Sequence, residues 1–386
     1  MTVPAAPSLE PITVRPVETD GDLDAFLNLP ARVYRGDDRW VPPLRSQIAK
    51  ELGPENPFRT YGTLQAFVAY RDEATGSEPV GRIVAAVNDR LVAKEDRAVG
   101  LFGYFECIDD LSVARALLDH AIGWLRDRGM VALRGPIDLS THIRCLMLVD
   151  GFEDAPYIMM PYNPPYYPHL MEKLGFEKAK DAYAYTIPTN IVANPIFERA
   201  HRVATRSGVS FRPVNLKGDA FTEDAKAIYR LFTQAFKENY SSTPRTEADF
   251  LEEAKDLQSI VNPDFFPIAE IDGEMVGFLM ALPDYNIALR AANGRLNFWG
   301  ILKFLWARRK INRGRVLVIC SLPEYITKRI PLALIYIALN NVQNTKNPYR
   351  TAELGYIYED NYPSRKLVEA IGGTITKTYR IYEQEI

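Results

Sequence analysis

The chain carries an internal repeat with a nearly constant offset. The segment Ile-Thr-Val-Arg-Pro-Val at 12–17 returns as Val-Ser-Phe-Arg-Pro-Val at 209–214, an offset of 197 residues, and Val80-Gly81 returns as Val276-Gly277 at an offset of 196. Four further matches keep the offset of 197: Glu172 with Glu369, Gly175 with Gly372, Lys180 with Lys377, and Tyr185 with Tyr382. Matches spread this widely at one spacing indicate duplication of a whole domain of about 190 residues.

The repeat predicts where the chain divides. We expect a first lobe over 1–188 that contains a polar loop at 135–160. A connection over 189–208 leads to a second lobe over 209–386, which carries an insertion at 283–314. Because the insertions differ between the copies, each lobe is expected to have its own specialisation.

Composition narrows the class of protein. The 386 residues are 47% hydrophobic and 25% charged, which is typical of a globular protein with substantial cores. A net charge of −3 argues against nucleic acid as a partner. Three cysteines without CxxC spacing favour neither a disulfide framework nor a metal site. The first residues lack the pattern of a secretory signal, and the apolar run at 330–339 is too short to span a bilayer. We therefore expect a cytoplasmic protein.

Hydrophobic periodicity predicts the same order of strands and helices in both halves. The order is strand, helix, three strands, helix, strand, helix and strand. Turn signals support it: Asp272-Gly273 predicts a hairpin, and Gly129, Gly175 and Gly372 mark the ends of helices. This order predicts an α/β fold in which each lobe has a mixed central sheet with helices on both faces.

With its late segments, the chain resembles the GCN5-related N-acetyltransferase (GNAT) superfamily. The stretch 359–373 has an acidic strand end, an asparagine, a helix and then glycine, and 162–176 is the same segment in the first half. The resemblance covers nearly the whole chain as two fused GNAT-like lobes. It implies transfer of an acyl group to an amine, with acyl-CoA or an acyl carrier protein as the thioester cosubstrate and no permanently bound cofactor or metal.

The resemblance also implies a donor site between the fourth and fifth strands of a lobe. In the superfamily, the pyrophosphate of the donor rests on a glycine-rich turn at a helix N-terminus. The aligned stretch 323–334 lacks those glycines but carries cations, whereas the turn at 106–112 in the first lobe is acidic and would repel a pyrophosphate. We therefore expect the donor at the second lobe. The predicted donor-binding residues are Leu322, Lys328, Arg329, Asn361 and Asn163.

Glu106 is the first candidate catalytic residue. It ends an apolar strand, and a buried carboxylate there would have a raised pKa suited to a general base. The alternative is that Glu106 only adds negative charge at the start of the helix over 110–128.

Further candidates lie in the polar loop and at a tyrosine-rich helix start. His142 and Cys145 belong to a dense polar stretch that is typical of a pocket-lining loop, although either residue could instead be structural. The tyrosine with which the superfamily protonates the leaving thiolate is replaced by Met171 and Val368. Tyr166 or Tyr167 is a possible substitute, and packing around the proline-rich turn is the alternative role.

The insertion of the second lobe is aromatic and basic. This pattern suits a helix in a membrane interface, a lid over a long acyl chain, or a helix docked on its own lobe. The residues predicted to contact substrate or membrane are Phe298, Trp299, Leu302, Trp306, Arg308 and Arg309.

Several blocks resemble those of bacterial ceramide synthases, including Phe-Glu-Cys-Ile-Asp-Asp at 105–110 and Met-Met-Pro-Tyr-Asn-Pro-Pro-Tyr-Tyr at 159–167. This resemblance implies N-acylation of a long-chain sphingoid base, with a possible location at the inner membrane surface. Two alternatives stay open. One is a non-catalytic module that binds a lipid or acyl chain, and the other is a small-molecule or aminoacyl transferase.

Overall fold

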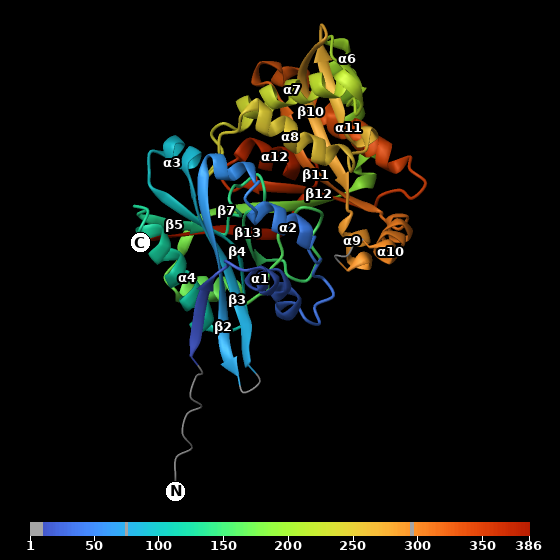
Figure 1. Ribbon diagram of the computed structural model, residues 1–386. Coiled ribbons are helices and arrows are strands. Elements are labelled where there is room, and N and C mark those ends of the chain that lie inside the picture. The colour runs from blue at the N-terminus through green and yellow to red at the C-terminus, as the bar shows by residue number, and fades with distance from the viewer. Residues whose placement is uncertain (1–10, 74–75, 294–296) are drawn as a thin grey trace. The chain divides into compact units, whose positions relative to one another are not determined.

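The computed structural model describes residues 11–73, 76–293 and 297–386, which form two compact units (Figure 1). Unit 1 contains the described residues up to Val149, together with Pro161–Ala179 and Arg380–Ile386. Unit 2 contains Asp150–Met160 and Lys180–Tyr379. Each unit has its own set of paired strands and its own hydrophobic core.

The sheet of unit 1 is antiparallel except at one position. Neighbouring strands follow the order β1, β2, β3, β4, β5 and the end of β13, and β4 with β5 is the parallel pair. The strands are β1 (Ile12–Pro16), β2 (Gly62–Glu73), β3 (Gly76–Asn88), β4 (Val99–Cys107), β5 (Ala132–Gly135), the short β6 (Met147–Asp150) and β13 (Thr374–Glu385).

Helices cover both faces of this sheet. A side chain at Gly81 of β3 would collide with Leu117 of α4, whereas the next residue, Arg82, donates a hydrogen bond to Phe26 in α1. Because neighbouring residues of a strand point to opposite faces, α1 and α4 lie on opposite sides. The helices are α1 (Asp20–Val33), α2 (Arg45–Leu52), η1 (Pro57–Thr60), α3 (Asp89–Glu95), α4 (Leu111–Arg126) and α5 (Tyr167–Lys173).

Unit 2 repeats this design. Its strands follow the order β7, β12, β11, β10, β9 and β8, and β11 with β12 is the parallel pair. The strands are β7 (Glu177–Pro188), β8 (Ser210–Pro213), β9 (Pro267–Ile271), β10 (Glu274–Pro283), β11 (Arg313–Ser321) and β12 (Thr351–Tyr358).

The helices of unit 2 again pack on both faces. Gly277 of β10 lies against Ile330 of α11, while its neighbour Phe278 joins the apolar cluster that contains Ile228 and Leu231 of α7. The helices are η2 (Thr189–Ala193), α6 (Pro195–Arg206), α7 (Gly218–Phe236), α8 (Glu247–Gln258), η3 (Pro263–Phe265), α9 (Asn286–Ala292), α10 (Phe298–Arg308), η4 (Pro323–Lys328), α11 (Ile330–Gln343) and α12 (Tyr362–Ala370).

The last strand of each sequence half completes the unit formed mainly by the other half. Residues 182–188 of β7 pair with 351–358 of β12 inside unit 2. Residues 382–385 of β13 pair with 132–135 of β5 inside unit 1. The compact units therefore differ from the halves of the repeat, because each takes a closing strand from elsewhere in the chain.

The predicted fold class is confirmed, and the differences are local. The predicted order has one helix between the first two strands, whereas the structure adds α2 within residues 35–58, and the insertion at 283–314 contains α9 and α10. A helix of only eight residues such as α2 gives a weak periodic signal, which explains why it was missed. Across the described residues, no helix combines the length and the apolar character needed to cross a membrane.

Candidate functional site

In both units the parallel strand pair separates early. β4 pairs with β5 only from Val99 to Leu101, although β4 continues to Cys107. In unit 2, β11 pairs with β12 only from Arg313 to Val316 and continues to Ser321. Each unit thus has a gap beside the second half of its fourth strand, where backbone groups lose their partner on one side.

In unit 1 the polar loop fills this gap. Ile137 donates its backbone N–H to Phe102 across the gap at 2.7 Å. The Asp138 carboxylate accepts the backbone N–H of Tyr104 at 2.5 Å, where β4 adopts a left-handed conformation with φ of 49°. A side chain on Gly103 would lie 2.5 Å from both Asp138 and the Ile137 carbonyl oxygen. The loop therefore occupies the place in unit 1 where a ligand would otherwise meet the strand.

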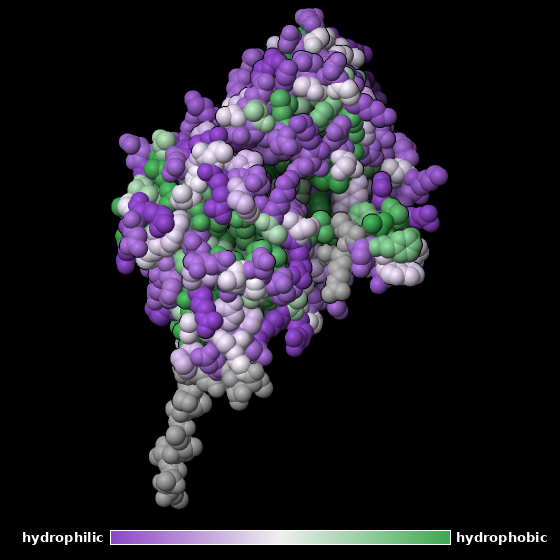
Figure 2. Space-filling view, viewed as in Figure 1, coloured by the Kyte–Doolittle hydropathy of each residue, from purple (hydrophilic) through white to green (hydrophobic). Residues whose placement is uncertain are grey.

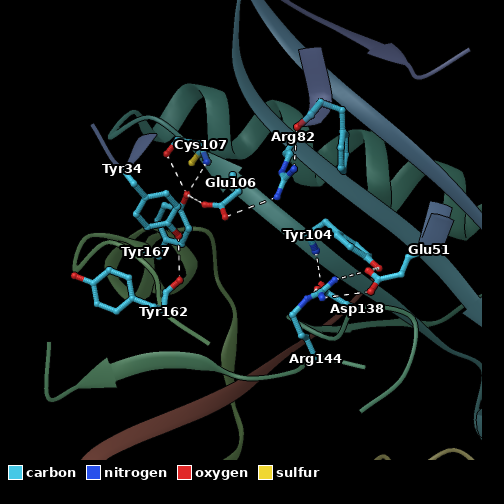
Figure 3. Close-up of polar contacts among 11 residues, drawn as sticks. Tyr34, Glu51, Arg82, Tyr104, Glu106, Cys107, Asp138, Arg144, Tyr162 and Tyr167 are labelled. Atoms are coloured by element: carbon cyan, nitrogen blue, oxygen red, sulfur yellow. Dashed lines mark hydrogen bonds and ion pairs between the residues drawn. The ribbon is translucent and has the colours of Figure 1, made fainter. Parts of the chain in front are cut away.

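Glu106 lies at the end of β4 in a group of tyrosines and an arginine (Figure 3). The Tyr167 hydroxyl donates to one carboxylate oxygen at 2.7 Å, and Arg82 lies 3.9 Å from the other. The Tyr34 hydroxyl hydrogen-bonds the Tyr162 carbonyl at 3.0 Å and also faces Glu106. The Glu106 side chain remains 14% exposed, so a small amine could reach it.

This environment sets the protonation state of Glu106. Burial raises the pKa of Glu106 to about 7, while the Arg82 charge and the Tyr167 hydrogen bond oppose the rise. Arg82 is held in place by its bond to the Phe26 carbonyl oxygen at 2.8 Å. A carboxyl group with a pKa near neutrality can both accept and release a proton at neutral pH. The arrangement is therefore suited to a general base.

A second polar cluster fixes the loop against the strand (Figure 3). Arg144 forms ion pairs with Asp138 at 2.7 Å and with Glu51 of α2 at 2.5 Å. The Tyr104 hydroxyl donates to the same Glu51 carboxylate at 2.7 Å. Arg144 and Tyr104 each contact both carboxylates, so these four residues hold the loop against β4 and α2.

Unit 2 has apolar residues where unit 1 has the Arg82–Glu106 pair. The strand register places Arg82 opposite Glu106 in unit 1 and Phe278 opposite Cys320 in unit 2. Phe278 and Cys320 are buried, and burial raises the pKa of the Cys320 thiol to about 12, which makes it a poor nucleophile at neutral pH. The duplicated position therefore offers a base in unit 1 alone.

The gap of unit 2 has a different lining. Residues 316–319 of β11 are partly exposed where the strand leaves β12. Beyond the strand, α11 begins at Ile330 without a side-chain hydrogen bond to its first N–H groups, and Arg329 precedes it with φ of 59°. An uncapped helix N-terminus attracts anions. The predicted donor residues Lys328 and Arg329 lie here, and the Lys328 ammonium donates to the Ser207 carbonyl oxygen. Leu322 follows the last residue of β11, and its backbone N–H donates a hydrogen bond to the Val276 carbonyl oxygen.

Unit 2 also holds a carboxylate that the sequence analysis did not single out. Glu353 of β12 is fully buried, and neither of its carboxylate oxygens has a hydrogen-bond partner among the described residues. Burial raises the pKa of Glu353 to about 7, although Arg315 and Lys377 oppose the rise. A glutamate inside the apolar run 351–358 was the available sequence signal.

The remaining catalytic candidates have different surroundings. The Tyr166 hydroxyl donates to the Cys107 carbonyl at 2.7 Å, which places it beside Glu106, and burial raises its pKa. Cys145 is buried and its thiol contacts the Thr141 carbonyl within the loop. His142 belongs to the same loop, where its backbone N–H donates to Ser140. The contact with the Cys107 carbonyl oxygen thus joins Tyr166 to the Glu106 group, whereas the His142 and Cys145 contacts given above lie within the loop.

The two asparagines that were predicted to bind the donor form hydrogen bonds with backbone groups. Asn163 is buried, accepts from the Leu148 N–H at 2.7 Å, and donates to the Leu148 and Pro164 carbonyl oxygens. Asn361 caps α12 by accepting the Ser364 N–H at 3.3 Å. The two asparagines thus make different structural contacts, and their contact with the donor stays a prediction.

Two known proteins are similar to this chain over nearly its full length. No family model matches it. It is 30% identical over 384 residues to the bacterial ceramide synthase of Caulobacter vibrioides, covering 97% of this chain and 98% of that protein. It is also 30% identical over 378 residues to protein YghO of Escherichia coli, covering 97% and 95%. The chain belongs to the bacterial ceramide synthase family.

Solved structures agree on the fold. A tandem GNAT protein from the clavulanic acid biosynthesis pathway matches with a TM-score of 0.60 at 14% identity, covering 97% of this chain and 98% of that one. A GCN5-related N-acetyltransferase from Sphaerobacter thermophilus matches with a TM-score of 0.52 at 13% identity, covering 97% and 95%. The protein thus has the tandem GNAT fold, and the ceramide synthase family to which it belongs makes it an acyltransferase.

The structure adds residues that sequence reasoning missed. Arg82 and Tyr34 lie far from Glu106 in sequence, and only the packing of α1 and β3 against β4 brings them to the carboxylate. An arginine inside the apolar strand 80–87 was the one available signal, since a buried cation needs a partner.

Proposed function

We propose that this acyltransferase transfers a long-chain acyl group from a thioester to a sphingoid-type amine, with Glu106 as the general base. The observation that carries the proposal is the buried, partly accessible Glu106 carboxyl group, whose pKa of about 7 is set by burial against Arg82 and Tyr167. The substrate class is supported by the ceramide synthase of Caulobacter vibrioides, which is 30% identical over nearly the full chain.

The proposed reaction begins with proton transfer. The Glu106 carboxylate accepts a proton from the substrate ammonium, and the neutral amine attacks the thioester carbonyl carbon. A C–N bond forms, the C–S bond breaks, and the thiolate leaves, while the nitrogen releases its second proton, which replaces through solvent the proton given to the thiolate. Tyr166 retains its hydroxyl proton at neutral pH because burial raises its pKa, so it can supply a proton to the leaving thiolate. The Tyr167 hydrogen bond orients the carboxylate for the first step.

The donor elements are proposed from unit 2 by itself. The separated strands β11 and β12 leave room for the pantetheine arm, and the uncapped start of α11 with Lys328 and Arg329 suits a pyrophosphate. In unit 1 the equivalent places are occupied by Asp138 in the gap and by Asp110 at the N-terminus of α4. The expected consequence is that Lys328→Ala and Arg329→Ala weaken CoA binding measured by calorimetry.

The exposed helix α10 is proposed to meet the long-chain substrate at a membrane surface. Phe298, Trp299 and Trp306 are 69%, 70% and 61% exposed, and Figure 2 shows apolar side chains on the surface at α10. Exposed apolar side chains in this number are unusual for a helix that only covers its own domain. Cations at the end of α10 suit an anionic surface.

The test is turnover by a Glu106→Gln variant. Purified protein is incubated with palmitoyl-CoA and sphinganine, and the amide product is followed by mass spectrometry. Because a general base contributes about 10²- to 10⁴-fold, we expect the variant to lose activity by that factor. The rate of amide formation by the unmodified protein is expected to rise as the pH increases through about 7, because Glu106 then loses its proton.

Asp109→Asn is the matched control. It removes a neighbouring exposed acid near the start of α4 and contacts neither Arg82 nor Tyr167 in the described structure. If Glu106 only adds negative charge at the N-terminus of α4, Glu106→Gln and Asp109→Asn should lose the same small part of the activity. That result would show that the assignment of Glu106 as the base is wrong. If the protein forms no amide and binds no CoA, the proposed reaction is wrong as a whole.

A further inference from the structure

An open polar pocket lies at the C-terminal end of α10 in unit 2. Its volume is about 470 Å³. One wall is the end of α10, and the others come from the segment before β9, the end of β10 and the turn after α11. The pocket therefore adjoins the exposed aromatic helix without belonging to the gap between β11 and β12.

The pocket is strongly cationic. Arg308 and Arg309 line it from α10, and Lys346 lines it from the turn after α11. Among the described residues that line it, none carries a carboxylate, and the other polar lining groups are hydroxyls and amides. The Arg308 guanidinium lies 6.0 Å from the centre of the Tyr285 ring, which also lines the pocket. Three positive charges without an acid in one hollow favour a compact anion.

The position of the pocket beside α10 favours a lipid phosphate over a soluble anion. The apolar side chains of α10 that stand outside the pocket include Ile301, Leu302 and Leu305, which are exposed together with the aromatic residues. A helix with this composition inserts its apolar side into the boundary between lipid headgroups and acyl chains. Cations at its end would then lie at the depth of the lipid phosphates. A soluble anion would gain nothing from the apolar helix.

We infer that this pocket binds the phosphate headgroup of an anionic membrane lipid while α10 enters the surface of the bilayer. The inference rests on the proposed membrane contact of α10 and adds a defined headgroup site to it. It makes membrane binding selective for phosphate-bearing lipids, beyond general attraction to negative charge. The expected function is to hold the enzyme at the surface where a long-chain amine is found.

The test compares two lysines that carry the same charge. Lys346 lines the pocket but lies outside α10, whereas Lys303 is exposed on α10 and lies outside the pocket. Full-length protein is floated with vesicles of phosphatidylcholine that contain phosphatidylglycerol. We expect Lys346→Ala to reduce binding roughly tenfold through loss of a charge-assisted contact. Lys303→Ala should reduce it by no more than about fivefold, the effect of one charge near the surface.

Vesicle composition separates phosphate recognition from charge. A second set of vesicles carries oleate at a matched surface potential, so that the negative charge is a carboxylate. We expect the unmodified protein to prefer phosphatidylglycerol vesicles and the Lys346→Ala variant to show no preference. Equal losses for Lys303→Ala and Lys346→Ala, or equal binding to both vesicles, would overturn the headgroup site.

Other failures remain distinguishable. If the unmodified protein floats with neither vesicle, the membrane contact of α10 is wrong and the headgroup site with it. If Lys346→Ala loses calorimetric binding of CoA while vesicle binding is unchanged, the pocket takes a soluble phosphate instead, and the inference is wrong. Flotation requires no turnover, so Glu106→Gln is expected to bind vesicles like the unmodified protein. Thermal unfolding of each variant checks that it is folded.

Discussion

At the scale of single residues, Glu106 shows how burial gives a common side chain an uncommon pKa. Desolvation favours the neutral carboxylic acid, while Arg82 and Tyr167 favour the carboxylate, and desolvation is the stronger effect. The duplicated position in unit 2 holds Cys320 opposite Phe278, two buried side chains that carry no charge. One copy of the repeat therefore keeps a chemically useful group at a cost in stability that the other copy avoids.

This cost predicts a pH-dependent stability. The pKa of Glu106 is about 7 in the folded protein against an ordinary value of 4.5, so the folded state binds its proton more tightly. The resulting stability is present below pH 4.5 and is lost as the pH rises through about 7. Between pH 5 and pH 8 we expect the unmodified protein to lose about 2–3 kcal/mol of stability relative to Glu106→Gln, which has no carboxyl group to titrate at this position.

Thermal unfolding at pH 5 and pH 8 measures this difference. The stability of the unmodified protein should fall more steeply than that of Glu106→Gln between these two values. Parallel curves for the two proteins would show that the folded and unfolded states bind the Glu106 proton equally, and that the raised pKa is wrong.

At the scale of elements, the polar loop and β4 depend on close contact at Gly103. The loop crosses the gap so closely that a side chain at this position would meet the Ile137 carbonyl and Asp138 at 2.5 Å. The contact also aligns Asp138 with the Tyr104 N–H. Strand, loop and the Arg144–Glu51 pair therefore form one rigid support beside Glu106.

Gly103→Ala tests this support. We expect a loss of about 1–3 kcal/mol in the free energy of unfolding, because the added methyl group overpacks backbone that has no room to move. Gly123→Ala is the control, since a side chain there meets nothing within 4 Å and α4 should gain up to about 1 kcal/mol. Urea unfolding measures both, and equal effects would contradict the tight contact.

At the scale of the whole molecule, each compact unit depends on a strand from the other half of the repeat. Within unit 1, β13 supplies Tyr382, which is fully buried, and Glu383, which bonds to the buried Arg134 at 2.6 Å. These contacts join residues about 250 positions apart, so their entropic cost of closure is high. Folding of unit 1 is therefore coupled to the presence of the end of the chain.

Removal of residues 380–386 tests this coupling. We expect β5 of unit 1 to lose hydrogen-exchange protection, because the deletion removes the strand pairing of 382–385 with 132–135 and the ion pair of Glu383 with Arg134, which keeps its second ion pair with Glu95. Removal of residues 385–386 alone keeps Tyr382 and Glu383 and should leave β5 protected. Full protection of β5 after the longer truncation would show that unit 1 folds without this strand.

The sequence by itself determined the duplication, the α/β class and the GNAT-like fold. Repeats, periodicity and turn residues are patterns along the chain, so they can be recognised without knowledge of the fold. It also placed Glu106 at the end of a buried strand and located the aromatic, basic segment that forms α10. Only the tertiary structure decided which residues surround Glu106, that Asp138 fills the gap of unit 1, and that the closing strands are exchanged. These features depend on contacts between residues far apart in sequence, which no local pattern encodes.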